Sequence, residues 1–376
     1  MKVFIIGRSL PEKHNGMIGV FEKQQALAIS KYYPTTHYVY FDDRSIKVNH
    51  RITDINFKEK NLIINGKMIP IRGLPNPVYK KLKSILYIKF LNELFLKYGV
   101  PDVIHIHFPL LTMTEQVWDF LISKEVKIIV TEHWSKIQTG EINNSQKDFL
   151  KKIYSDSDAF ICVSEDLKKG VQSICDSKKN IYVIPNMVSD LFKYKEKNKK
   201  AGTFNFIAVG RLTPNKRFDL LIDAFNMAFK DDDKVFLTIL GDGKLKKILN
   251  KKIERYNLQN QIFLEGFKEP NEVAKYFQDA DCYVSASNLE TFGVPTIEAW
   301  MSGIPVIIAD NSPLLNYINQ YNGVIFEVDN PSSLCDKLEY IYKSTEIFNK
   351  NKICEYANRI FSEEAITLRL IEIYLN

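Results

Sequence analysis

The sequence predicts an α/β protein made of two doubly wound domains, each with a largely parallel sheet covered by helices. Short apolar runs of strand length alternate with amphipathic stretches of helical length along most of the chain. This alternation stops in a polar, charged and aperiodic segment at 189–202. A chain of 376 residues can bury two hydrophobic cores. We therefore expect a first domain at 1–188, a linker at 189–202, a second domain at 203–355 and a C-terminal segment at 356–376.

The first domain is expected to begin with a buried strand and to continue as an alternating series. The predicted strands are Val3–Ile6, His37–Phe41, Val103–Ile106, Lys127–Thr131, Ala159–Val163 and Tyr182–Ile184. The predicted helices are Phe21–Lys31, Tyr79–Lys97, Thr114–Ser123, Ser145–Tyr154 and Asp166–Ile174. The segment Ile52–Ile71 breaks the series, because it has period-two patches around Asn65-Gly66, a dipeptide typical of hairpin turns. We expect it to form a small antiparallel excursion at the sheet edge.

The second domain repeats the alternation of strands and helices. Its predicted strands are Phe204–Val209, Val235–Leu240, Ile262–Leu264, Cys282–Ser285, Pro305–Ile308 and Gly323–Phe326. Its predicted helices are Arg217–Phe229, Lys244–Tyr256, Asn271–Gln278, Thr296–Met301 and Pro331–Tyr342, followed by two helices near Ile347–Arg359 and Ser362–Leu375.

Composition and charge suit a soluble globular protein, with 45% hydrophobic and 26% charged residues. The net charge of +6 would suit an anionic substrate or an anionic membrane surface, and no nucleic-acid motif accompanies it, so we expect no nucleic-acid partner. The cysteines form no Cys-x-x-Cys pair, so we expect reduced packing residues and neither disulfides nor a zinc site. They are Cys162, Cys175, Cys282, Cys335 and Cys354. Without a signal peptide or a bilayer-spanning run, the chain is expected to be cytoplasmic.

Two carboxylates eight positions apart flank a predicted strand-to-helix turn. We expect Glu290 in the loop and Glu298 in the first helical turn, because Pro295 suits the first position of a helix. Gly293 lets the backbone approach a ligand, and free N–H groups at a helix start attract phosphate. The carboxylates are then expected to accept hydrogen bonds from hydroxyls on either side of a diphosphate. This arrangement of groups describes a nucleotide sugar.

Cationic side chains follow the first strand of the second domain, in Gly210-Arg-Leu-Thr-Pro-Asn-Lys-Arg217. Ligands of open α/β sheets bind beyond the carboxyl ends of strands, so Arg211 and Lys216 are on the edge where they could clamp a diphosphate. Both could instead be solvated loop cations, and the sequence does not separate Arg217 from Lys216. Their predicted place on the same edge as the two carboxylates favours the binding role.

Two glycine-containing turns follow the next strands. Gly241-Asp-Gly243 could be a tight strand-to-helix turn or part of the ligand edge. Gly266 could let a base edge approach the backbone, and Phe267 could pack on that base, although an aromatic residue at a strand end more often packs within the protein.

Three histidines lie near the carboxyl ends of neighbouring strands in the first domain. Alternation along a strand points His105 and His107 the same way and leaves the direction of His133 undetermined. A metal site is one interpretation, but no carboxylate is locked into a ligand spacing. We favour His133 as a cleft residue over a metal ligand, with His107 as a weaker cleft candidate.

These motifs resemble glycosyltransferase family 4. The resemblance is carried by Glu-x7-Glu at Glu290 to Glu298, Gly-Arg-Leu-x-Pro-x-Lys at 210–216, Gly241-Asp-Gly243, Gly266-Phe267, Ala280-Asp281 and Ala299-Trp-Met-Ser-Gly-Ile-Pro-Val306. Pro185-Asn186 resembles the end of that family's first domain. The match covers most of residues 180–330, whereas the first half matches mainly in architecture.

The resemblance implies a GT-B fold, in which two Rossmann-like domains face a central cleft and the final helix returns to the first domain. It implies transfer of a sugar from a UDP- or GDP-linked donor with retention of configuration, without a cofactor or bound metal. By position, Glu298 would hold the ribose hydroxyls, Glu290 the donor sugar, and Arg211 and Lys216 the diphosphate. His133 matches a histidine near the reacting sugar. The implied catalytic residues are Glu290, His133, Arg211 and Lys216, and the implied donor-binding residues are Glu298, Gly210, Gly241, Gly266, Phe267, Phe292, Gly293 and Val294.

One loop departs from the family pattern. Many members carry a Gly-Gly pair after the first strand, but here Gly16 and Gly19 are separated within residues 11–20. That loop usually faces the acceptor, so Gly16 is an acceptor-side candidate together with His107. The pattern from Gly16 to Phe21 resembles members that build bacterial surface polysaccharides, which implies a glycan or lipid-linked glycan acceptor.

Two other functions remain open. A nucleotide-sugar epimerase with the same fold would act without an acceptor, and the Glu290/Glu298 pattern argues against it. A non-catalytic subunit that binds nucleotide sugar would be expected to lack Arg211, Lys216 or one of the two Glu residues, and all four are present.

The predicted helix Tyr79–Lys97 could bring the protein to the inner face of an anionic membrane. Its basic and apolar residues are Lys80, Lys81, Lys83 and Lys89, with Leu82, Ile85, Leu86 and Phe90. An amphipathic helix can lie in the membrane interface, but the same apolar face could simply pack on the sheet.

Overall fold

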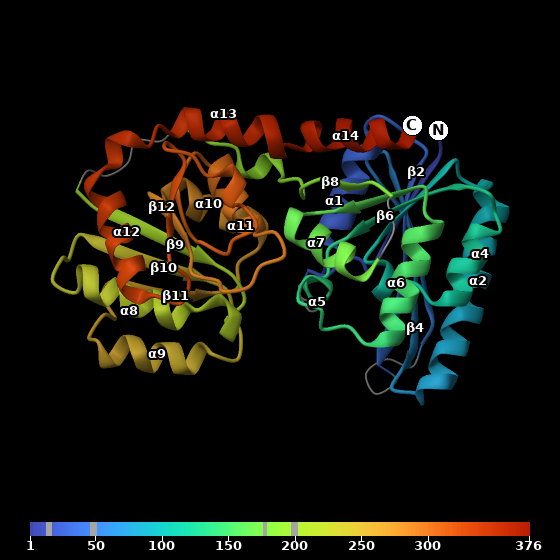
Figure 1. Cartoon of the computed structure of the whole chain (residues 1–376), viewed down its shortest axis with the longest axis horizontal. Coiled ribbons are helices and arrows are strands. Elements are labelled where there is room, and N and C mark those ends of the chain that lie inside the picture. The colour runs from blue at the N-terminus through green and yellow to red at the C-terminus, as the bar shows by residue number, and fades with distance from the viewer. Residues whose placement is uncertain (13–16, 46–50, 176–178, 197–201) are drawn as a thin grey trace. The chain divides into compact units, whose positions relative to one another are not determined.

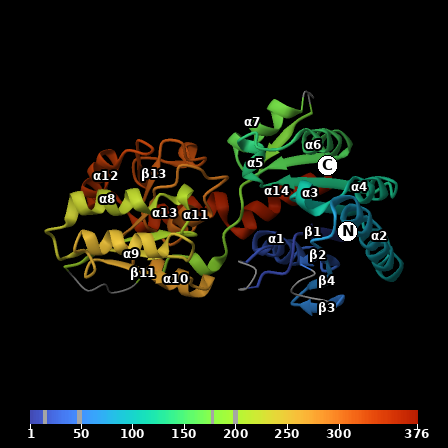
Figure 2. The same cartoon turned by 90° about the horizontal axis from the view of Figure 1, so that it is seen from below.

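The computed structural model describes residues 1–12, 17–45, 51–175, 179–196 and 202–376 (Figures 1 and 2). The chain divides into two compact units. The first unit consists of Met1–Met187 together with Ile366–Asn376, and the second consists of Val188–Ala365.

The described part of the first unit contains an eight-stranded sheet with the order β3-β4-β2-β1-β5-β6-β7-β8. The strands are β1 (Val3–Gly7), β2 (Thr36–Ser45), β3 (Thr53–Glu59), β4 (Leu62–Arg72), β5 (Val103–His107), β6 (Lys127–Glu132), β7 (Ala159–Cys162) and β8 (Ile181–Val183). Neighbouring strands are parallel except for β3 and β4. The chain order reverses between β1 and β5, so this pair marks the topological switch point, where open sheets bind ligands.

Helices cover both faces of this sheet. They are α1 (Val20–Ser30), α2 (Asn76–Tyr98), α3 (Pro109–Thr112), α4 (Glu115–Ile122), α5 (Ser135–Gln138), α6 (Asn144–Asp156), α7 (Glu165–Ile174) and α14 (Glu363–Leu375). On one face, α1 and α14 share an apolar cluster with strand residues such as Val3 and Ile5. On the other face, Phe95 of α2 packs against Phe4, with ring centroids 5.9 Å apart. Phe4 and Ile5 thus serve opposite layers, as strand alternation requires.

The β3–β4 hairpin lies at the edge of the sheet as predicted, but its turn is not at Asn65-Gly66. The turn begins at Lys60, which has a left-handed backbone (φ 56°), and Asn65 and Gly66 lie inside β4. Gly66 is needed there for packing, since a Cβ atom would lie 2.0 Å from the ring of Tyr40. The prediction was wrong because the dipeptide serves a contact with β2 and not a turn.

The described part of the second unit contains a six-stranded sheet with the order β11-β10-β9-β12-β13-β14 and parallel pairing throughout. The strands are β9 (Phe204–Val209), β10 (Val235–Leu240), β11 (Ile262–Gly266), β12 (Cys282–Ser285), β13 (Val306–Ala309) and β14 (Gly323–Phe326). The helices are α8 (Phe218–Phe229), α9 (Lys246–Arg255), α10 (Pro270–Asp279), α11 (Val294–Met301), α12 (Pro331–Lys343) and α13 (Lys350–Phe361). Short 3₁₀ helices are η2 (Asp190–Phe192), η3 (Pro214–Lys216), η4 (Leu315–Tyr317) and η5 (Thr345–Ile347). The order reverses between β9 and β12, which is the switch point of this sheet. The predicted α/β class is confirmed in both units.

The described part of the predicted linker packs on the second unit. Phe192 is buried, its carbonyl accepts a hydrogen bond from Ser302 Oγ (2.9 Å), and the Tyr194 N–H donates to the Met301 carbonyl (2.9 Å). Residues 197–201 lie outside the described part of the chain.

The C-terminal helices belong to different units. Phe361 of α13 stacks on Trp300 in the second unit, with ring centroids 6.2 Å apart. From Ile366 onward, α14 belongs to the first unit, where the Tyr374 hydroxyl lies 2.7 Å from His105 Nδ1.

The five cysteines are buried and free, as predicted. No helix within the described ranges is both long enough and apolar enough to cross a membrane.

Candidate functional site

The loops that follow β9 and β12 meet at the switch point of the second sheet. The Asn288 N–H donates to the Asn215 carbonyl (3.0 Å), and Asn215 Nδ2 donates to the Leu289 carbonyl (3.4 Å). Across this junction the Lys216 ammonium pairs with the Glu290 carboxylate. The structure therefore brings together the cationic loop and the acidic loop, which the sequence predicted on one edge.

The three cations of the first of these loops have different surroundings. Arg217 has a left-handed backbone (φ 47°), and its guanidinium pairs with Asp219 and Asp329, away from the carboxylates. Arg211 is exposed and makes no ion pair with any residue that the structure describes. Of the two cations that the sequence could not separate, Lys216 is the one at the acidic loop.

Glu298 lies on α11, which begins directly after the left-handed Gly293 (φ 88°). Glu298 is the fifth residue of this helix, so it lies just past the first turn and not within it as predicted. The helix begins at Val294, one residue earlier than Pro295 suggested, with Gly293 at its N-cap position. Burial raises the pKa of the Glu298 carboxyl to about 8.

The two carboxylates lie near one hydroxyl. Burial and then the charge of Glu290 raise the pKa of Tyr283 on β12, and Glu298 adds to the same effect. The charges of Glu290 and Glu298 therefore both act on the Tyr283 hydroxyl.

Bare backbone forms the rest of this edge. Gly210 follows β9, Gly241 follows β10, and Gly266 ends β11. The Gly241 N–H donates to the Gly266 carbonyl (2.7 Å), and a Cβ atom on Gly241 would lie 1.9 Å from the Gly210 carbonyl oxygen. Gly241 also has a φ of 139°, which side chains disfavour. A ligand at this edge can approach the backbone without meeting side chains from these three positions.

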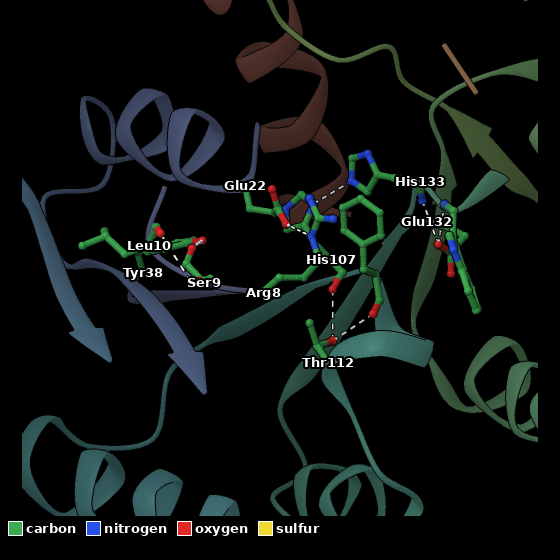
Figure 3. A network of polar contacts seen from close by, with 11 residues as sticks. Arg8, Ser9, Leu10, Glu22, Tyr38, His107, Thr112, Glu132 and His133 are labelled. Carbon is green, nitrogen blue, oxygen red and sulfur yellow. Dashed lines mark hydrogen bonds and ion pairs between the residues drawn. The ribbon is translucent and has the colours of Figure 1, made fainter. Parts of the chain in front are cut away.

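Side chains build the switch point of the first sheet (Figure 3). Arg8 follows β1, and its Nε donates to the buried Glu22 carboxylate (2.7 Å). The Arg8 guanidinium lies over the Phe108 ring, 3.6 Å from its centroid, and Phe108 stacks on His133 at 4.5 Å. Sequence reasoning missed Arg8. The signal that could have found it is its position after the first strand of its sheet, which matches that of Arg211.

The three predicted histidines form one buried group. The rings of His105 and His107 stack with centroids 4.5 Å apart, which confirms that they point the same way. His107 Nδ1 lies 2.9 Å from His133 Nε2, whereas His105 is bonded to Tyr374 and Thr131. Burial lowers the pKa of all three rings well below the usual value, so they are neutral at neutral pH.

The His107–His133 pair has two free ring nitrogens. His107 Nε2 and His133 Nδ1 are buried and have no hydrogen-bond partner among the described residues. Since two neutral rings share one proton in their mutual bond, one free nitrogen is a donor and the other is an acceptor. Within the described ranges, no group of three or more His, Cys, Asp or Glu side chains could hold a metal ion.

The remaining predicted residues differ in what they can offer a ligand. The Phe267 side chain is partly exposed just beyond β11. The Phe292 side chain is buried, so Phe292 could act only through its backbone, beside Gly293 and Val294 at the start of α11. Gly16 lies outside the described residues.

Comparison with solved structures defines the class of the fold. Alr3699/HepE of Anabaena, solved with UDP and glucose, matches with a TM-score of 0.75 at 16% identity, over 99% of this chain and 98% of that chain. Together with the two parallel sheets and their switch points, this similarity shows the GT-B fold, with two Rossmann-like domains.

Sequence comparisons then give the family. The model for Glycosyltransferase Family 4 matches residues 50–190, and the model for Glycosyl transferases group 1 matches residues 191–360. An uncharacterized glycosyltransferase of Methanocaldococcus jannaschii is 29% identical over 332 residues, which cover 84% of this chain and 88% of that protein. The alpha-monoglucosyldiacylglycerol synthase of Streptococcus pneumoniae is 29% identical over 187 residues, which cover 46% of this chain and 42% of the synthase. The chain is a glycosyltransferase with the GT-B fold.

Proposed function

We propose that this glycosyltransferase moves a sugar, with retention of configuration, from a UDP- or GDP-linked donor to a hydroxyl of a glycan or lipid-linked glycan. The observation that carries the proposal is the junction at the second switch point, where Lys216, Glu290 and Glu298 border an edge of bare glycine backbone. The similarity to a glycolipid synthase supports a place for this reaction in bacterial surface-polymer synthesis.

Each group at this junction has a proposed role. Arg211 and Lys216 bind the diphosphate, together with the free N–H groups at the start of α11. Glu298 accepts hydrogen bonds from the ribose hydroxyls, and Glu290 accepts them from the donor sugar. The cations and amides stabilise the charge that develops on the leaving nucleoside diphosphate. In the first unit, His133 offers its free Nδ1 to the reacting sugar.

The test is a thermal-shift screen of UDP- and GDP-sugars, followed by turnover with the best binder and NMR of the product's anomeric configuration. We expect a stabilising nucleotide sugar and a product with the donor's configuration. Inversion would contradict the retaining mechanism. Interconversion of the donor without an acceptor would favour an epimerase, and tight binding without turnover would favour a binding subunit.

Metal independence is part of the proposal, because the two cations and the helix-start amides supply positive charge at the diphosphate. We expect activity to be unchanged after EDTA treatment and gel filtration. Loss of activity that manganese restores would contradict this role for Arg211 and Lys216.

The helix α2 presents a narrower basic face than the sequence predicted. The Lys83 side chain is only 8% exposed and pairs with Asp43 Oδ2 (3.2 Å). Phe90 is buried, with its ring centroid 6.5 Å from that of Phe41. Neither side chain is available to a membrane, because both belong to the packing between α2 and the sheet.

We propose that the exposed residues of α2 contact the inner face of an anionic membrane. Lys80, Lys81 and Lys89 are exposed, as are the apolar Ile85 and Leu96. Each basic residue near anionic lipid contributes about 1 kcal/mol. We expect flotation with anionic vesicles at low salt, and loss of flotation when Lys81 and Lys89 are both changed to Glu. Unchanged flotation of that double variant would exclude this helix as the contact.

A further inference from the structure

A cavity of about 1260 Å³ opens at the carboxyl edge of the first sheet. Its walls come from the residues after β1, from the C-terminal ends of β2 and β4, from the segment after β5, and from the N-terminal parts of α2, α4 and α6. It therefore borders the switch point between β1 and β5, where open α/β sheets bind ligands. Small-molecule sites usually measure about 300–1,000 Å³, so this cavity has room for more than one sugar unit.

Charge is balanced on the wall formed by β1 and β2. Arg8 is paired with Glu22 (2.7 Å), and Arg44 is paired with Asp42 (2.7 Å). Each of these cations is already matched by a carboxylate, so this wall has little net attraction for an anion.

Charge is unbalanced on the wall formed by the end of β4 and the start of α2. Lys83 Nζ and Arg72 Nη2 both contact the nearly buried Asp43, at 3.2 Å and 2.5 Å, and Tyr79 donates its hydroxyl to the same carboxylate. Burial alone would raise the pKa of Asp43, but Lys83, Tyr79 and Arg72 together lower that pKa. Asp43 is therefore ionised and holds two cations on the cavity wall.

A third cation increases this excess of positive charge. Lys80 lines the cavity, is exposed, and pairs with no carboxylate among the described residues. Arg72, Lys80 and Lys83 against Asp43 leave two positive charges on this wall. Of the remaining acidic residues of the lining, Asp42 is paired with Arg44, and Glu115 is exposed on α4.

The helix N-termini that border the cavity also favour an anion at the start of α2. The N-termini of α4 and α6 are capped by Thr114 and Asn143, whose side chains accept backbone N–H groups. The N-terminus of α2 follows Pro75 and has no side-chain cap. Its positive dipole end adds to the cationic wall. Elsewhere the lining offers hydroxyl and amide groups, such as those of Thr114 and Asn143, which suit hydroxyls of a ligand.

We infer that this cavity is the acceptor site and that the acceptor is a hydroxyl compound that carries a phosphate group, bound by Arg72 and Lys80. The inference rests on the proposed function, because it names the acceptor of that transfer. The acceptor oxygen forms the new bond to the anomeric carbon, and the bond from that carbon to the diphosphate oxygen breaks. The acceptor's hydroxyl proton leaves with the nucleoside diphosphate. The same phosphate chemistry is found in a soluble polyol phosphate and in a lipid headgroup.

Binding of simple probes to the full chain tests this inference. Titrations use inorganic phosphate and glycerol 3-phosphate, with glycerol as the uncharged match, and excess UDP and GDP to occupy the diphosphate site of the second unit. We expect both phosphate probes to bind and glycerol to bind far more weakly. Arg72→Gln and Lys80→Gln should each weaken phosphate binding about tenfold, the value for one charge-assisted hydrogen bond. The control Lys151→Gln changes an exposed lysine of α6 outside the cavity and should leave binding unchanged.

Lys80→Gln breaks no ion pair with a residue that the structure describes, so it remains informative even if Arg72→Gln disturbs Asp43 and the fold. Vesicles of phosphatidylglycerol and of phosphatidylcholine distinguish the two sources of phosphate. If vesicles bind through Lys80 while the soluble probes bind poorly, the group is a lipid headgroup. The inference is overturned if neither the soluble phosphate probes nor the phosphatidylglycerol vesicles bind, or if Lys80→Gln behaves like Lys151→Gln. The proposed function fails by a separate result, namely that no nucleotide sugar binds or turns over.

Discussion

The switch points of the two sheets share a Gly-Arg pair, but the arginine has different surroundings in each. Each sheet reverses its strand order once, and in each a Gly-Arg pair lies at the end of the first strand, Gly7-Arg8 in the first unit and Gly210-Arg211 in the second. Arg8 is fixed between a buried carboxylate and an aromatic ring, whereas Arg211 is exposed and unpaired among the described residues.

The difference separates a backbone-lined edge from one lined by side chains. Around Arg211 the neighbouring strand ends are glycines, so the shape of the edge is fixed by main chain. Around Arg8 the edge consists of histidines, aromatic rings and ion pairs. A backbone-lined edge suits the diphosphate that UDP- and GDP-linked sugars share. An edge lined by side chains can change the ligand that it binds by substitution, without a change of main chain.

The largest expected effect is a loss of stability caused by a substitution in the backbone-lined edge. Gly241→Ala places a Cβ atom 1.9 Å from the Gly210 carbonyl oxygen at a φ of 139°, so strain and overlap should destabilise the second unit by more than about 3 kcal/mol. Gly140→Ala is the matched control, because its φ is 72° but nothing lies within 4 Å of the added atom. We expect it to cost about 1 kcal/mol. Urea unfolding followed by circular dichroism measures both, and equal costs would contradict the steric argument.

The next effect concerns the charged junction beside that edge. If Glu290 and Lys216 have the proposed roles, Glu290→Gln and Lys216→Met should each lower kcat/KM by roughly 10- to 100-fold, because each would remove a charged hydrogen bond to the donor. The double variant should lose less than the sum of the two, since the side chains are paired. Arg217→Met is the control, because its guanidinium pairs away from the site. A loss in Arg217→Met equal to that in Lys216→Met would remove the distinction between these two neighbours.

The sequence predicted the second edge well because its residues follow strands directly. Because loops after parallel strands lie at one edge of the sheet, the sequence could place Arg211 and Glu290 on the same edge, and the structure shows that β9 and β12 are neighbours. The sequence could not separate Lys216 from Arg217, because their directions depend on the left-handed backbone of one residue. Glu298 lies past the first helical turn because α11 begins directly after Gly293, one residue before the predicted start.

The first edge was predicted less well because its groups meet across long separations in the chain. His107 and His133 are 26 residues apart, and Lys83 and Asp43 are 40 apart. No local pattern encodes such pairs, and Lys83 was therefore assigned to an exposed helix face. Gly66 was mistaken for a turn residue for the same reason, since its neighbour Tyr40 lies on another strand.

A smaller effect is expected from the histidine pair at the first edge. His107→Gln removes the ring that orients His133, so it should lower kcat about tenfold and leave nucleotide affinity nearly unchanged. His107→Phe preserves the ring shape but not the hydrogen bond, and should be as slow as His133→Gln. Steady-state kinetics and nucleotide titrations give the two quantities. If both His107 variants kept the wild-type kcat, His107 would be a packing residue only.

The smallest effect is a pH dependence of the folding stability, which arises from Glu298 at the backbone-lined edge. Burial raises the pKa of Glu298 to about 8, from 4.5 in the unfolded chain, so between these values the folded protein binds a proton that the unfolded chain has lost. This contribution to stability is present at low pH and is lost as the pH rises through about 8. Glu298→Gln should flatten that part of the stability curve.

Nucleotide binding should show the opposite trend, and this sign distinguishes a ligand-binding carboxyl from a merely buried one. If the ribose hydroxyls bind the ionised form, nucleotide binding expels the proton, and affinity should rise roughly fivefold between pH 7 and pH 8 and then level off. The histidines of the first edge are neutral across this range and do not contribute. Calorimetry in two buffers of different ionisation enthalpy should detect about one proton released at pH 7 in the wild type and none in Glu298→Gln. Equal proton release in both proteins would show that Glu298 does not bind the ribose.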